Sequence, residues 1–222
     1  MRSTRAIALF IVLGIVTCSA QSSPEEDPIC DRQGSKKVDI ADDDATILGF
    51  SIGHTSLDEV QAKLGKATIE RMSHDEESDV AICYVSSADG TVFAVYSGAM
   101  GGWKDITSFA LWSREVRFPN VSRCTSSTEV SRALTTKSGI RLGLTAAELK
   151  RIVGVPSKVS DFSMKYDYAC RRKMTQDEIT SFITTNNLDV KKYGYFDRMS
   201  WIDVRFKTAT VSRVEVGRTE SW

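Results

Sequence analysis

The sequence is poor in histidine and has no net charge, and each scarcity excludes a class of function. Two histidines among 222 residues leave little material for a histidine-rich metal site or an ordinary catalytic triad. The 29 basic and 29 acidic side chains cancel, whereas a nucleic-acid-binding protein needs a basic surface to displace counterions. No Ser-x-x-Lys nucleophile motif of the penicillin-recognising enzymes occurs in the chain. The composition, 41% hydrophobic and 26% charged, is that of a folded soluble protein.

The first twenty residues have the three parts of a secretory signal. Arg2 and Arg5 precede an apolar run, residues 6–17, and the small residues 18–20 follow it. As a helix this run spans about 18 Å, well short of the roughly 30 Å of hydrocarbon in a bilayer. The pattern therefore predicts an export signal, residues 1–20, rather than a membrane span.

Two processing routes stay open for this signal. Cleavage after Ala20 would release a soluble protein that begins at Gln21. Alternatively, the sequence Ile15-Val16-Thr17-Cys18 resembles a bacterial lipobox, in which Cys18 is the lipidated first residue. Both routes predict an exported protein, periplasmic, anchored to the outer membrane or secreted, that meets a membrane only through that lipid.

A repeat of about ninety residues organises the rest of the chain. The stretch from Ile52 to Ala67 aligns with the stretch from Leu142 to Pro156 after one deletion. In each copy a capping box predicts the start of a short helix, and a glycine just past the last apolar position predicts its end. The capping pairs are Thr145 with Glu148 in the second copy and either Thr55 with Asp58 or Ser56 with Glu59 in the first.

Three antiparallel strands are expected after each helix, which predicts an α+β fold of two tandem units, each with a small sheet. Alternating apolar residues place them at 80–85, 92–97 and 106–113, and at 164–170, 201–207 and 211–217. A third capping box, Thr175 to Glu178, predicts an extra helix, residues 176–184, inserted in the second unit. Entry strands are expected at 36–40 and 129–134.

The predicted organisation therefore has five parts. They are a signal peptide (1–20), an N-terminal segment with Cys30 (21–46), a first unit (47–116), a linker and entry strand with Cys124 (117–138), and a second unit (139–218).

Four cysteines, leaving Cys18 aside, occupy matching positions in the two copies. Cys30 and Cys124 lie 23 and 19 residues before the glycines at 53 and 143, and Cys83 and Cys170 lie 30 and 27 residues after them. Four cysteines allow three pairings, and the repeat selects Cys30–Cys83 with Cys124–Cys170. An oxidising compartment makes disulfides the expected state. No close Cys-x-x-Cys pair supports a zinc site, so no metal is expected.

The candidate site is the face of the sheet that points away from the helices. In the strand 201–207, Ile202, Val204 and Phe206 should point toward the helix, which leaves Trp201 and Arg205 on the other face. Tyrosine, tryptophan and arginine on one surface are typical of a protein-binding hot spot. The loops 100–103 and 193–196 should rim it, unless the sheets or the inserted helix cover the aromatic residues. The candidate residues are Tyr96, Trp103, Trp112, Trp201, Arg205 and Arg213.

The helix start Leu142-Gly143-Leu144-Thr145 and helix end Val153-Gly154-Val155-Pro156, followed by a small sheet, resemble the SmpA/OmlA (BamE-like) domain. Two such units in tandem, over 47–113 and 139–218, are similar in architecture to the β-lactamase inhibitor protein family. The resemblance implies an extracytoplasmic, non-enzymatic protein without a cofactor. Such a protein binds a protein partner in the cell envelope, as an assembly accessory or an inhibitor. An envelope hydrolase and a small-ligand-binding protein are the alternatives.

Overall fold

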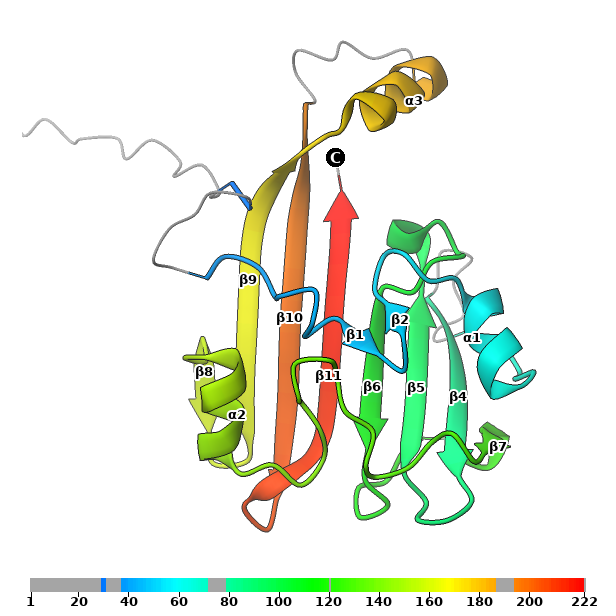
Figure 1. The fold of residues 1–222 in the computed structure, drawn as a ribbon, viewed down its shortest axis with the longest axis vertical. Coiled ribbons are helices and arrows are strands. Elements are labelled where there is room, and N and C mark those ends of the chain that lie inside the picture. Colours follow the sequence, from blue (N-terminus) through cyan, green and yellow to red (C-terminus); the bar gives the residue numbers. More distant parts are fainter. Residues whose placement is uncertain (1–28, 31–36, 72–78, 120, 187–193, 222) are drawn as a thin grey trace, which may run out of the picture.

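The computed structural model is an α+β fold in which a large sheet carries short helices on one face (Figure 1). It describes residues 29–30, 37–71, 79–119, 121–186 and 194–221. The signal 1–20 and Cys18 lie outside the described residues. In chain order the sheet strands are β3 (Glu70–Arg71), β4 (Val80–Ser86), β5 (Val92–Ser97), β6 (Ser108–Trp112), β7 (Thr125–Ser127), β8 (Lys158–Ser160), β9 (Ser163–Lys173), β10 (Tyr195–Lys207) and β11 (Thr210–Ser221).

The strands are ordered β3-β4-β5-β6-β11-β10-β9-β8, and all pairs along this path are antiparallel. β7 lies outside the path and pairs parallel with β4. The strands expected for the two units meet at the centre, where β6 pairs with β11 and Trp112 lies opposite Arg213. The structure therefore has one continuous sheet where the sequence predicts a small sheet in each unit.

Two helices of similar length pack on the same face of this sheet. α1 (Leu57–Leu64) begins at the Ser56 and Glu59 capping box, and α2 (Ala146–Val153) begins at that of Thr145 and Glu148. Their apolar sides are buried against the sheet. The alternating strand residues Ile202 and Val204 point into the same core, as predicted. α3 (Gln176–Asn186) is the inserted helix and lies beyond the ends of β9 and β10 (Figure 1).

Two entry segments cross the helix face of the sheet in opposite directions. Residues 37–45 pass over β9, β10 and β11 toward the small ribbon of β1 (Thr46–Ile47) and β2 (Phe50–Ser51) (Figure 1). Residues 128–145 run from β7 toward α2 and meet the first segment where Ser138 N donates to Asp43 O at 3.0 Å. Neither 37–40 nor 129–134 is a strand. The strand formed on entry to the second half is β7.

The disulfides are Cys30–Cys170 and Cys83–Cys124, so the predicted pairing of Cys30 with Cys83 and Cys124 with Cys170 is wrong. Each entry segment starts beside the strands of the other half. Cys124 precedes β7, which pairs with β4, and Cys30 follows the bridge of Ile29 to Arg171 on β9. Because β4 and β9 are separated by four strands, the predicted partners lie far apart. The repeat shows that the cysteines occupy matching positions in the two copies. It does not determine whether each disulfide joins two cysteines of the same copy or of different copies.

No helix among the residues that the structure describes is long and apolar enough to cross a membrane.

Candidate functional site

The face of the sheet opposite α1 and α2, called the open face below, has a floor of small residues. Strand pairing places Ala94 opposite Ala110, and Ser108 opposite Gly217. Ala81 lies in the same row as Ser108, one strand beyond Tyr96. Small side chains across four neighbouring strands leave room for larger side chains to lie flat on the sheet.

Tyr96, Trp112 and Trp201 rise from three different strands around this floor. A β-carbon built on Gly217 would overlap the indole ring of Trp201, so the ring lies directly against the glycine backbone. The indole Nε1 of Trp201 donates to Glu215 Oε1 at 3.4 Å. Because residue 217 has no side chain, the indole ring can lie against the sheet, and the hydrogen bond to Glu215 stabilises it there.

Arg213 lies on the same face, two residues before Glu215 on β11. Its guanidinium lies 4.4 Å from the ring centre of Trp112 and pairs with the carboxylate of Glu215. Trp112 also makes an edge-to-face contact with Phe118, with ring centres 5.2 Å apart. The Trp112 Nε1 and Arg213 Nε atoms are buried and have no hydrogen-bond partner among the described residues. Stacking on an aromatic ring is therefore a major contact of this cation.

These side chains enclose a hollow of about 490 Å³, within the range of small-ligand sites. Carboxylates stand at both ends, with Glu215 on one side and Glu70 and Asp79 on the other. Residues that line the hollow include Glu70, Asp79, Ala81, Cys83, Tyr96, Met100, Ser108, Trp112, Phe118, Trp201, Arg213 and Glu215.

Among the titratable residues that line the hollow, Tyr96 has a pKa that clearly differs from its ordinary value. Burial, and secondarily the negative charge of Glu215, raise the pKa of Tyr96 to about 12, although Arg213 acts in the opposite direction. The hydroxyl is therefore protonated at neutral pH. It can donate and accept hydrogen bonds, but it cannot serve as a general base.

The structure brings four of the six predicted residues together: Tyr96, Trp112, Trp201 and Arg213 all line the hollow. Arg205 lies opposite Arg213 in the strand pairing, is exposed and does not line the hollow. Trp103 is not part of this site. It follows the turn η1 (Ala99–Gly101) and borders a separate hollow beside Leu57.

Among the lining residues that were not predicted, Phe118, Glu70 and Asp79 contribute an aromatic ring and two carboxylates. The aromatic residue Phe118, followed by Pro119 shortly after the strand 108–112, is the signal that could have marked the first. Glu70 and Asp79 reach the hollow through the pairing of β3 with β4, for which the sequence gives no pattern. The described residues of α3 do not line the hollow.

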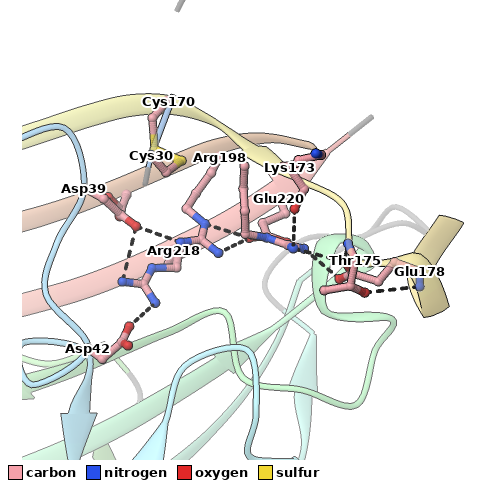
Figure 2. Close-up of polar contacts among 12 residues, drawn as sticks. Cys30, Asp39, Asp42, Cys170, Lys173, Thr175, Glu178, Arg198, Arg218 and Glu220 are labelled. Carbon is pink, nitrogen blue, oxygen red and sulfur yellow. Dashed lines mark hydrogen bonds and ion pairs between the residues drawn. A yellow bond between two sulfur atoms is a disulfide. The ribbon is translucent and has the colours of Figure 1, made fainter. Parts of the chain in front are cut away.

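A second polar cluster lies on the helix face at the ends of β9, β10 and β11 (Figure 2). Arg172 contacts Glu178 and Glu220, each at 2.7 Å, and Arg198 contacts Asp39 at 2.8 Å. The set is completed by Arg218, which pairs with Asp39 and Asp42, and by the Arg198–Glu220 pair. All three guanidinium groups are engaged by carboxylates, so this cluster is an ion-pair latch that joins the first entry segment and α3 to the sheet.

The latch shifts the titration of its acids. The Arg172 hydrogen bond is the main cause that lowers the pKa of Glu178 to about 2. For Glu220, burial acts to raise the pKa, but hydrogen bonds from Arg172 and Arg198 outweigh it and the pKa is lowered. Both carboxylates are therefore ionised, and the latch closed, at neutral pH.

The described residues contain no group of three or more histidine, cysteine or acidic side chains that could hold a metal ion. Comparison of the chain with protein-family models, with curated proteins and with solved structures gave no significant match.

Proposed function

We propose that the chain is an exported, non-enzymatic protein-binding module that contacts its partner through the open face of the sheet. The observation that carries the proposal is the hollow walled by Tyr96, Trp112 and Trp201. Aromatic and arginine side chains are the commonest hot-spot residues, and a preformed recess lets a partner bury a side chain without first rearranging the surface. The two disulfides are compatible with an oxidising, extracytoplasmic compartment.

The tandem-unit interpretation forms part of this proposal. Along the antiparallel path, four strands lie on each side of the centre of the sheet, where β6 pairs with β11. The short strands β3 and β8 form its two edges. Each half also carries one capped helix of eight residues on the same face. This correspondence supports two SmpA/OmlA (BamE-like) units, merged through β6 and β11, in an envelope assembly accessory or an inhibitor. A lipid on Cys18 would be its membrane contact.

An envelope hydrolase is less well supported. Such an enzyme needs a nucleophile with a base, or two carboxyl groups whose pKa values are driven apart. Among the described lining residues, Tyr96 stays protonated and Glu215 is held by Arg213. A small-ligand-binding protein is the second candidate, and the observation that favours it is the volume of the hollow.

Site-specific photocrosslinking in the host envelope tests the proposal. A photoreactive residue at Met100, which lines the hollow and is 53% exposed, should form an adduct with a discrete protein partner. Val155 is 91% exposed but follows α2 on the other side of the sheet, so it is the matched control position. Equal adducts from both positions, or no protein adduct from Met100, would overturn the open face as the docking surface.

A further inference from the structure

The hollow on the open face contains more carboxylates than cations. Glu70, Asp79 and Glu215 line it, and Arg213 is the single basic lining residue among those described. Arg213 is already paired with Glu215. Glu70 makes a peripheral contact of 3.4 Å with Arg123, whose side chain is largely exposed. Asp79 has no ion pair among the described residues. The unbalanced charge of the hollow is therefore negative.

The walls supply the other component of a cation site. The faces of tryptophan and tyrosine rings carry negative potential and attract ammonium and guanidinium groups. The open face already holds one cation in this way, because Arg213 stacks on Trp112 and pairs with an acid at the same time. Trp201 lies flat against Gly217 on one side, which leaves the rest of its ring to border the hollow.

We propose that the hollow receives a lysine or arginine side chain of the protein partner. The alkyl stem would lie against Tyr96 and Trp201, and the charged end would lie toward the carboxylates. The volume exceeds that of one such side chain, so a neighbouring apolar residue of the partner can pack against Met100 and Phe118. This inference rests on the proposed function and specifies the chemistry of the partner.

Other occupants fit the observations less well. An acidic side chain would face three carboxylates and a guanidinium that is already engaged. A purely apolar side chain would use the aromatic walls but would gain nothing from Asp79 and Glu70. A basic side chain with an alkyl stem is complementary to both features.

Titration of the intact protein with small probes tests the proposal. The indole N–H signals of Trp112 and Trp201 are followed by nuclear magnetic resonance, which detects millimolar binding. The probes are the Nα-acetyl amides of arginine and lysine, of citrulline as the neutral isostere of arginine, and of glutamate. We expect the cationic probes to shift the Trp201 signal, with arginine bound about fivefold more tightly than citrulline.

Two carboxylate variants sharpen the test. Asp79→Asn should weaken binding of the arginine probe about two- to threefold, because it removes the unpaired charge at the end of the hollow. Asp161→Asn removes an exposed acid between β8 and β9 and should leave the affinity unchanged. Equal affinities for arginine and citrulline, or shifts of the indole signals by the glutamate probe alone, would overturn the proposal.

The two proposals can fail separately. If the cationic probes leave the indole signals unmoved while Met100 still crosslinks to a protein, the cation preference is wrong and the docking surface stands. If the arginine probe binds and no crosslinked protein is found at Met100, the cation preference stands and the docking function is wrong.

Discussion

The indole ring of Trp201 occupies the space that a side chain at Gly217 would need. The two residues lie opposite each other on β10 and β11. This approach, which only glycine permits, gives the hollow a wall that is in place before any partner arrives. Preorganisation of this kind lowers the entropic cost of binding.

Gly217→Ala should remove that wall. The added methyl group forces the indole away from the sheet, and we expect a loss of about 1–3 kcal/mol in the free energy of unfolding, as for other overpacked positions. Chemical denaturation measures this loss, and near-ultraviolet circular dichroism should report the displaced tryptophan. In the double variant Trp201→Ala with Gly217→Ala the methyl group meets no ring. A penalty for the alanine that persists there would contradict the proposed contact.

Trp112→Ala and Trp201→Ala should each reduce partner crosslinking from Met100, because each removes part of the hollow. Truncation of a central aromatic residue in an interface costs about 2 kcal/mol or more, which corresponds to roughly 30-fold in affinity. Arg205→Ala is the matched control, since Arg205 lies on the same face but outside the hollow. Far-ultraviolet circular dichroism should show a native spectrum for all three. Equal loss in the Arg205 variant would place the docking surface elsewhere.

Peptide mapping without reduction should recover Cys30 joined to Cys170 and Cys83 joined to Cys124. The first bond closes 140 residues and the second closes 41. In the chain-entropy model, removal of the longer bond costs about 5 kcal/mol and removal of the shorter one about 4 kcal/mol. Denaturation of the paired Cys→Ala variants measures both losses. Recovery of Cys30 joined to Cys83 would contradict the crossing of the entry segments.

Acid should open the latch between Arg172 and Glu178. The pKa of Glu178 is lowered from 4.5 to about 2, so its contribution to stability is complete above pH 4.5 and is lost as the pH falls toward 2. The pair is partly exposed, so screening limits the effect to about 1 kcal/mol. The protection factors of the α3 amides, which are corrected for the pH dependence of intrinsic hydrogen exchange, should therefore fall over this range. Glu178→Gln should lower these protection factors at neutral pH and remove most of their acid dependence; an unchanged profile would contradict the latch.

The three α-helices and the strands β4, β5, β6, β9, β10 and β11 were predictable because their signals are local, whereas the short strands β1, β2, β3, β7 and β8 were not predicted. Capping boxes at Thr145 and Thr175 located the starts of α2 and α3, and alternation in residues 201–207 identified the buried face of β10. For α1 the sequence left two capping pairs open, and the structure has Ser56 with Glu59.

The parts of the site that escaped prediction depend on which strands become neighbours. Phe118 reaches Trp112 because its linker leaves β6 and must return to β7 at the far side of β4. No local pattern encodes that route. The prediction for Trp103 was wrong because the glycine-rich loop before it allows many directions, and the structure places this residue, with a φ of +63°, beside Leu57.

The crossed disulfides impose an order on maturation. In the exported protein proposed above, the chain would emerge from its N-terminus, and Cys30 and Cys83 would be the first two thiols of the mature fold to meet an oxidising compartment together. Neither belongs with the other in the folded protein. The native bond of Cys83 can form only after Cys124 has emerged. The native bond of Cys30 can form only after Cys170, which lies close to the C-terminal strands, has emerged. Export from the N-terminus would thus favour early formation of a non-native bond, and a high yield of folded protein would then require thiol–disulfide exchange once the whole chain is present.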